Sequence, residues 1–407
     1  MANVTQLKHL EHLEDEMLNY GVEGCMAAVS FLQEIRKMLG SDNSTGFMQT
    51  KWDGVPSVVC GINPRTENFF IGTKSVFNKE EPKIASSENG IDMYYGEKSP
   101  DLAKKLKLCF KYFSQLGIKG VIQGDFLADK SDVKTETVNG EKLYTFGNQA
   151  LTYGIPVDHP IGTKIKNAEV IIVFHTHYTG DHVPSMQAKA GVGETLNEIK
   201  EVAVINNDTP MHRVGLSNQE ATNFDKMISA IEKNCKECGD FLDQLVLLSG
   251  TKGDEKYHVA SYVKQFFNSE IKAARAIGDV SKTFASLYNF YYDKTTALLD
   301  KIKTPKTRAQ KSKLVHDSQN YLRENEGKFK AMIDLYKKIQ ESKQFIIDKL
   351  DDLETFRTFA LTDNGYKVTG PEGYVLHKDG DMVKLVNRLE FSYINFTLAK
   401  KLSLIHI

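Results

Sequence analysis

The sequence predicts an α+β protein in which the sheet is interrupted by a long helical segment. Apolar residues recur with a period of two between residues 46 and 178 and again between 370 and 388, which is typical of strands. They recur with a helical period before residue 40 and from about 217 to 360. The 407 residues are 41% hydrophobic and 26% charged, which suits a globular protein of about two or three domains.

The domain boundaries follow these changes of period. The prediction is an N-terminal helical segment, the first part of a sheet core, a helical insertion and a final hairpin of the core, over residues 1–45, 46–216, 217–360 and 361–401. The last six residues, 402–407, match the translated end of a sequencing-library adapter. We therefore expect them to be an artefact and the natural chain to continue past Lys401.

Two helices are predicted before the sheet. The first carries an apolar stripe at helical spacing, formed by Leu7, Leu10, Leu13 and Leu18. Gly21 breaks this stripe, and a second helix runs from Glu23 to Gly40.

The sheet core is predicted from short alternating segments with turn residues between them. One further helix is expected over residues 99–116, and one hairpin is expected to turn at Asn139–Gly140. The strand segments are FMQTKW, PSVVCGI, NFFIGTKSVF, KGVIQGDFL, TETV, EKLYTF, ALTYGIPV and AEVIIVFHTHY. The final hairpin, EGYVLHKDGDMVKLV, is expected to turn at Asp379–Gly380.

Composition restricts the environment and the partners. The net charge of −1 gives no global basic field, so a nucleic acid would have to meet a local basic patch. No apolar run is long enough to span a bilayer, so we expect no membrane partner. Five cysteines, an odd number, are typical of a reducing compartment, which favours the cytoplasm, or the host cytoplasm if the protein is viral. The sequence does not predict an oligomeric state.

One tetrapeptide points to chemistry, the strand end Lys51–Trp52–Asp53–Gly54. We predict that the fold gathers three lysines and three carboxylates in one cleft: Lys51, Lys74, Lys384, Asp53, Asp125 and Glu372. Clustered lysines are costly unless an anion such as triphosphate joins them, and neighbouring cations make one amine a nucleophile. Carboxylates opposite the phosphates would hold Mg²⁺, with Mn²⁺ as an alternative. This set of groups suits attack of a lysine amine on the α-phosphate of a nucleoside triphosphate.

Six motifs in order resemble those of covalent nucleotidyltransferases, the ATP-dependent polynucleotide ligases and mRNA capping enzymes. The motifs are KWDG, GTKS, QGDF, VFHTHY, EGYVLH and MVKLV. The segments YTFGNQALTYGIP and HLEHLED are also similar to a set of tailed-phage proteins carrying this signature. The resemblance implies an antiparallel-sheet nucleotidyltransferase core, of the ATP-grasp-like ligase adenylation type, that uses ATP and Mg²⁺ and acts on nucleic acid.

By motif, the resemblance implies that Lys51 becomes the lysyl-AMP and that Asp53 contacts this lysine or the ribose. Lys384 would grip the α-phosphate and help to expel pyrophosphate. The last motif of the family usually reads Lys-x-Lys, but here it reads Lys-Leu-Val, so one phosphate contact is missing unless Arg388 supplies it. The insertion also stretches the separation between Lys51 and Glu372 to 321 residues, which is atypical.

The remaining motif residues would bind the nucleotide and the metal. The resemblance implies that Lys74 touches phosphate or the 5′ end, and that Phe174 stacks on the base. Asp125 would bind metal or ribose, and Glu372 would bind metal. RNA is favoured over DNA because the additions are helical and no OB-type strand pattern follows the core.

Each residue also has a structural interpretation. Lys51 and Asp53 would form a plain turn, and Phe174 would be a core aromatic. Lys74 would be a solvated lysine, and Asp125 and Glu372 would be charges at strand ends. His175 and His177 are either ligands or a hydrogen-bonded structural pair.

Two motifs outside the core also have two interpretations. The Cys235–Cys238 pair has zinc-ligand spacing without a second pair. Residues 301–313 hold six basic side chains and no acidic one, which indicates either a solvated helix face or a contact with a phosphate backbone.

The sequence therefore favours an ATP-dependent polynucleotide ligase of the RNA-ligase type, which joins 5′-phosphate and 3′-hydroxyl ends through a lysyl-AMP intermediate. A non-sealing nucleotidyltransferase is the second hypothesis. The third is a catalytically silent phage protein, nucleic-acid-binding or virion, built on the same fold.

Overall fold

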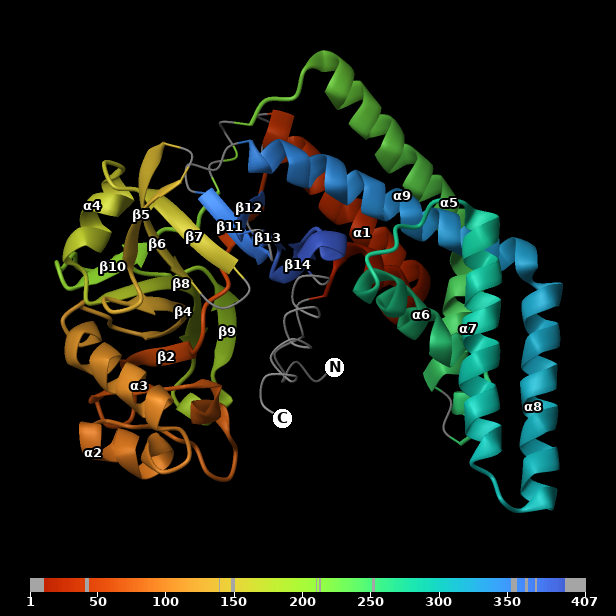
Figure 1. The fold of residues 1–407 in the computed structure, drawn as a ribbon, viewed down its shortest axis with the longest axis horizontal. Coiled ribbons are helices and arrows are strands. Elements are labelled where there is room, and N and C mark those ends of the chain that lie inside the picture. Colours follow the sequence, from red (N-terminus) through yellow and green to blue (C-terminus); the bar gives the residue numbers. More distant parts are fainter. Residues whose placement is uncertain are drawn as a thin grey trace. The chain divides into compact units, whose positions relative to one another are not determined.

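The structure is a computed structural model (Figure 1). It describes residues 11–40, 44–138, 140–147, 151–209, 211, 214–250, 253–352, 357–362, 365–369 and 372–391. The start of the predicted first helix, with Leu7 and Leu10, lies outside these residues, as does the predicted adapter artefact at 402–407. The described chain is α+β, as predicted, and its two larger sheets are antiparallel except for one parallel pair, residues 170–173 with residues 202–205.

The chain divides into two compact units. The first, which we call the sheet unit, comprises residues 1–9, 48–209 and 354–380. The second, the helical unit, comprises residues 10–47, 210–353 and 381–407.

The sheet unit contains two larger sheets. In the six-stranded sheet the order is β10-β8-β4-β2-β3, with β9 added on β8. Its strands are β2 (Ser57–Ile62), β3 (Phe69–Gly72), β4 (Val121–Asp129), β8 (Val170–Thr179), β9 (Gln187–Ala190) and β10 (Val202–Ile205). In the five-stranded sheet the order is β12-β11-β7-β6-β5. Its strands are β5 (Lys134–Val138), β6 (Glu141–Gly147), β7 (Leu151–Pro156), β11 (Arg357–Thr362) and β12 (Gly365–Thr369).

The central strand β8 is buried on both faces, so its apolar residues serve two cores. Ile172 and Phe174 pack with α3 (Pro100–Phe113), whose apolar side lies on this sheet. Ile171 and Val173 belong to a second core that includes side chains of the five-stranded sheet. Strands buried on both faces show continuous apolar runs, which explains the VIIVF sequence of β8.

A third, small sheet carries the predicted nucleophile. The strand β1 (Phe47–Lys51) is a neighbour of β13 (Gly373–Lys378). After β13 the chain turns at Asp379 and Gly380, with φ of 50° and 91°, into β14 (Asp381–Leu385). Two successive residues with positive φ are typical of a type I′ hairpin turn, so the predicted Asp-Gly turn is confirmed.

Several short elements of the sheet unit were not predicted. They are β9 to β12, the helices α2 (Glu88–Ile91) and α4 (Pro160–Asn167), and a π-turn over Asp92–Gly96. The predicted strand NFFIGTKSVF is shorter than expected. It ends at Gly72, and Lys74–Phe77 form a 3₁₀ turn capped by the Thr73 hydroxyl.

The helical unit combines the N-terminal helix with the insertion, which the sequence had suggested as separate segments. It holds a 3₁₀ turn (Leu13–Asp15), α1 (Glu16–Gly40), α5 (Asn218–Gly250), α6 (Ala260–Lys272), α7 (Val280–Asp300), α8 (Pro305–Glu324) and α9 (Glu326–Asp351). Figure 1 shows α1 beside α5 and α9, and α7 and α8 side by side. Among the described residues, no helix combines the length and the apolar content needed to cross a bilayer.

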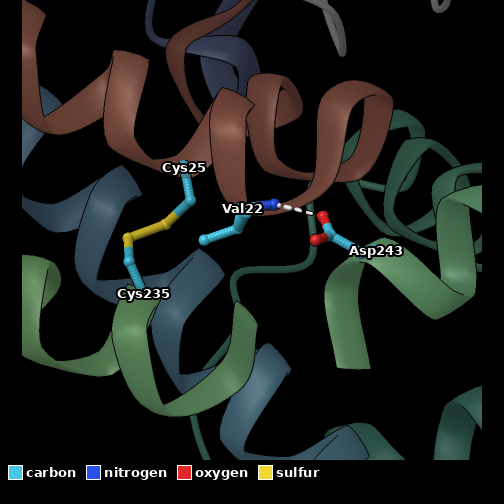
Figure 2. Close-up of a disulfide and its surroundings, with 4 residues drawn as sticks. All are labelled: Val22, Cys25, Cys235 and Asp243. Carbon is cyan, nitrogen blue, oxygen red and sulfur yellow. Dashed lines mark hydrogen bonds between the residues drawn. A yellow bond between two sulfur atoms is a disulfide. The ribbon is translucent and has the colours of Figure 1, made fainter. Parts of the chain in front are cut away.

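The predicted break at Gly21 is confirmed. Gly21 has φ 63° and ψ −136°, so α1 is interrupted there and restarts at Val22. The backbone N–H of Val22 then needs an acceptor from outside the helix. The Asp243 carboxylate of α5 accepts this N–H at 2.8 Å, as an N-cap residue would (Figure 2). A side chain at position 21 would clash, because its Cβ would lie 2.0 Å from Asp243 Oδ1.

One turn further along, a disulfide joins the same two helices. Cys25 of α1 is bonded to Cys235 of α5, with a Cα–Cα distance of 5.9 Å (Figure 2). Cys235 therefore does not join Cys238 in a zinc site, and Cys238 is a buried free thiol. We expected a reducing compartment, where structural disulfides are rare, so this bond differs from that expectation.

Candidate functional site

The sheet unit brings Lys51 and Glu372 together. Lys51 is the last residue of β1, and Glu372 directly precedes β13, its neighbouring strand. The Lys51 Nζ forms an ion pair with Glu372 Oε2, and the two side chains remain 24% and 16% exposed. Strand pairing thus closes a sequence separation of 321 residues.

The loop after Lys51 is fixed by one tyrosine. The Asp53 backbone N–H donates to the Tyr153 hydroxyl at 2.7 Å, and the Trp52 ring lies 4.6 Å from the Tyr153 ring between centroids. A Cβ at Gly54 would lie 2.6 Å from the Phe126 carbonyl oxygen. The glycine of KWDG is therefore needed because β4 passes too close for a side chain.

Asp125 and His175 lie close together on adjacent strands. Asp125 lies on β4 and His175 on β8, and His175 Nε2 is 3.4 Å from Asp125 Oδ2. The ladder between these strands shifts register at Gln123/Gly124, next to this pair. His177 contacts the Gly191 carbonyl oxygen through Nδ1 at 2.9 Å, which matches its structural interpretation.

Tyr153 shows that the carboxylates share one region. Burial raises the pKa of the Tyr153 hydroxyl well above its usual value, and the charges of Glu372, Asp53 and Asp125 raise it further. Each of these three carboxylates therefore lies within electrostatic range of the same phenol. Four of the predicted residues, Lys51, Asp53, Asp125 and Glu372, belong to this region of the sheet unit.

Buried polar side chains form a hydrogen-bonded row at β1 and β13, the strands at whose ends Lys51 and Glu372 lie. The Gln49 amide contacts His377 Nε2 at 2.8 Å through its oxygen and Asn207 Oδ1 at 3.3 Å through its nitrogen. Burial, aided by the charge of His175, lowers the pKa of His377 to about 4. His377 is therefore neutral near pH 7. Sequence reasoning missed this row, although polar residues inside the buried strand β1 were a signal for it.

Two predicted residues of the sheet unit have other surroundings. Phe174 is 1% exposed and meets Phe113 of α3 edge-to-face, 5.6 Å between centroids. It is a core residue, so the prediction that it stacks on a base is wrong. Lys74 is exposed at the start of a 3₁₀ turn, and no contact among the described residues links it to Lys51.

Lys384 and Arg388 belong to the helical unit. The Lys384 backbone N–H donates to the Glu11 carbonyl at 2.9 Å, next to the chain entering α1. Arg388 is 8% exposed, and its guanidinium donates to Asp15 at 2.9 Å and to Asn268 at 2.6 Å. The prediction that Arg388 supplies a missing phosphate contact is therefore wrong, because buried acceptors already hold it.

Asp15, which accepts from Arg388, is part of a buried ionic cluster. Lys343 of α9 donates to both oxygens of Glu14 at 2.7 Å, and Asp15 also accepts from the Tyr336 hydroxyl at 3.2 Å. Burial opposes the charge of Glu14, but Lys343, His12 and Arg388 together lower its pKa to about 2. We call these residues, Glu14, Asp15, Tyr336, Lys343 and Arg388, the buried cluster.

The described residues contain no group of three or more histidine, cysteine or acidic side chains poised to hold a metal ion. Comparison with curated proteins and with solved structures gives no significant match. A protein-family profile matches residues 3–400, almost the whole chain. The chain therefore belongs to the family described as "Family of unknown function (DUF6267)".

Proposed function

We propose that this protein is a nucleotidyltransferase that attaches AMP from ATP to Lys51 and passes it to a polynucleotide end. The observation that supports this most is the ion pair between Lys51 and Glu372. A turn lysine with no chemical role has no need of a carboxylate 321 residues away, held at the end of the neighbouring strand.

The proposed step uses groups that lie in the sheet unit. The paired Lys51 ammonium first loses one proton, which frees the Nζ lone pair. The Nζ then forms a bond to the α-phosphorus, the bond from that phosphorus to pyrophosphate breaks, and the nitrogen loses a second proton to solvent. Glu372 holds the side chain in position before the nucleotide enters, and Tyr153 fixes the following loop through Asp53. Positioning of this kind is the larger part of catalysis in phosphoryl-type transfer.

The carboxylates suit the metal that the proposal needs. Mg²⁺ prefers oxygen ligands and is held by one or two carboxylates together with substrate phosphates, so no preformed cage is required. Asp125 and Glu372 would hold it, as the motif resemblance implies, and the charges of both carboxylates raise the pKa of the Tyr153 hydroxyl. When bound, the ion would neutralise charge on the phosphates. Lys384 lies in the helical unit, and the proposal does not depend on it.

The test is transfer of label from α-labelled ATP, and in parallel GTP, to the protein in the presence of Mg²⁺. We expect wild-type protein to carry label through denaturing electrophoresis and Lys51→Ala to carry none. Lys130→Ala is the matched control, because Lys130 is an exposed lysine of the same unit, paired with Glu169. It should label like wild type.

A folded wild-type protein that takes no label from either nucleotide would overturn the proposal and favour a silent protein. If label is found, sealing of nicked RNA, nicked DNA or single-stranded RNA separates a ligase from a non-sealing enzyme. We expect RNA to be sealed faster than DNA, following the substrate preference inferred from the sequence.

A further inference from the structure

The hairpin of α7 and α8 carries a concentration of positive charge that the proposed chemistry does not use. Residues 301–313, which connect α7 to α8 and form the first half of α8, hold six basic side chains and no acidic one. The chain as a whole has a net charge of −1. The positive charge of residues 301–313 is therefore a local feature and does not reflect the overall composition.

The first turns of α8 are exposed on all sides. Every residue from 303 to 310 is exposed, and the first buried residue of the helix is Val315. A helix that is polar all round gains nothing from packing, so its sequence is not explained by the core.

The basic residues of α8 fall on two faces with different partners. Arg308 donates to Asp300 at 2.8 Å, and Lys311 pairs with Asp254, so this face is tied to α7 and to the connection between α5 and α6. Lys306 and Lys313 are seven positions apart and therefore lie on one common face, away from Arg308 and Lys311. Among the described residues, no ion pair or side-chain hydrogen bond involves either of them.

Lys301 and Lys303, just before the helix, are exposed in the same way. None of the contacts described for the helical unit pairs these two side chains with an acid. We call Lys301, Lys303, Lys306 and Lys313 the lysine stripe. Exposed ammonium groups without an acidic partner are available to a bound polyanion.

We propose that the lysine stripe binds the phosphate backbone of a nucleic acid without regard to sequence. Lys306 and Lys313 are about 10 Å apart along the helix axis. That is about three nucleotides at the 3.4 Å rise of a duplex strand. Lysine ammonium groups are compact point charges that neutralise phosphates, whereas the planar fork of arginine matches phosphates and base edges with paired hydrogen bonds. The inference deepens the proposed function by naming the surface that holds the strand.

The experiment measures binding of a fluorescent RNA oligonucleotide, and of a DNA duplex, by anisotropy between about 50 and 200 mM salt. The tested variant is Lys301→Gln/Lys303→Gln/Lys306→Gln/Lys313→Gln. Each phosphate contact adds about 0.7 (single strand) or 0.9 (duplex) to the slope of log affinity against log salt. We expect the variant to bind more weakly and its slope to fall by about 3 with RNA and by about 4 with the duplex.

A matched control changes the net charge equally at other exposed lysines of the helical unit. It is Lys226→Gln/Lys233→Gln/Lys236→Gln/Lys328→Gln, in which Lys233 and Lys236 have acidic neighbours one turn away. Its slope should stay within about 1 of wild type. Equal slopes for all three proteins would overturn the proposal, and so would stripe-dependent binding to phosphatidylserine vesicles without binding to either oligonucleotide.

The outcome is separable from that of the proposed function. The stripe variant should still take label from α-labelled ATP, because Lys51 lies in the other unit. Loss of the salt slope with no label on any protein would retain the binding surface and reject the chemistry. Label on wild type together with an unchanged salt slope in the stripe variant would retain the proposed chemistry and reject the binding surface.

Discussion

The two units each contain a lysine–glutamate pair, and the pairs differ in burial. In the sheet unit, Lys51 and Glu372 remain 24% and 16% exposed. In the helical unit, Lys343 and Glu14 are 4% and 0% exposed. The buried pair also has further partners, since Asp15 and Arg388 lie in the same cluster.

This difference teaches what each pair can do. A buried pair is costly to break, because removal of one partner leaves a charge without compensation in a medium of low dielectric constant. A partly exposed pair contributes little to stability, because water already solvates both charges. An entering anion can therefore displace Glu372 from Lys51 in the sheet unit. In the buried cluster, the pair of Lys343 and Glu14 instead holds α9 against the turn that precedes α1.

The largest predicted effect comes from replacing the two lysines by methionine one at a time. Lys343→Met should lower the free energy of unfolding by about 3–5 kcal/mol, because Glu14 would be left buried without its partner. Lys51→Met should change it by less than about 1 kcal/mol. Urea unfolding followed by circular dichroism measures both. Equal losses in the two variants would refute the distinction between the pairs.

The disulfide should stabilise the helical unit alone. Reduction of Cys25–Cys235 removes a cross-link that closes a loop of 210 residues, and we expect a loss of about 2–4 kcal/mol in the unfolding of that unit. Thermal unfolding with and without reductant is the measurement. Cys25→Ser/Cys235→Ser should resemble the reduced protein and should no longer respond to reductant. A response that persists in this variant would point to a different pair of thiols.

The sheet unit should lose stability in mild acid. The pKa of His377 is about 4 in the folded protein and about 6.5 unfolded, so the unfolded chain binds the proton more tightly. Stability is then complete above pH 6.5 and falls as the pH falls from about 6.5 to 4, by up to about 3 kcal/mol. His377→Gln should flatten the curve of unfolding free energy against pH over this window. An unchanged slope would show that His377 is not responsible.

The smallest predicted effect concerns the shape of the loop at Lys51. Gly54→Ala places a methyl group 2.6 Å from the Phe126 carbonyl, and this overpacking should cost about 1–3 kcal/mol. Gly140→Ala is not a suitable control because Gly140 has φ 84°. Gly327→Ala is suitable, since a Cβ there meets nothing within 4 Å and alanine in helix α9 should not destabilise the protein. Labelling of Lys51 should fall in Gly54→Ala and not in Gly327→Ala.

One long-range contact was anticipated through the family resemblance. Lys51 and Glu372 were expected in one cleft, and their side chains meet because each lies at an end of a paired strand, while their chemical roles stay predictions. The Gly21 break and the Asp379–Gly380 turn were also predicted, since both depend on local backbone preferences of glycine. Features that depend on short-range conformation are encoded in a few neighbouring residues.

The errors concern side chains whose surroundings come from distant segments. Phe174 alternates correctly along β8, but only the position of α3 shows that its face is the core. Arg388 follows the last motif, yet Asp15 and Asn268, far away in sequence, determine its role. The cysteine pairing likewise joins residues that are 210 positions apart, a separation that spacing within CKEC cannot indicate.

The adjacency of β1 and β13 also sets the time at which the site can exist during protein synthesis. Lys51 leaves the ribosome early, but its carboxylate partner follows only after the helices of the insertion have been made. A nascent chain that stops before residue 372 carries Lys51 without Glu372. The pairing of these two residues is therefore a late step of folding, and contacts between residues far apart in sequence form slowly.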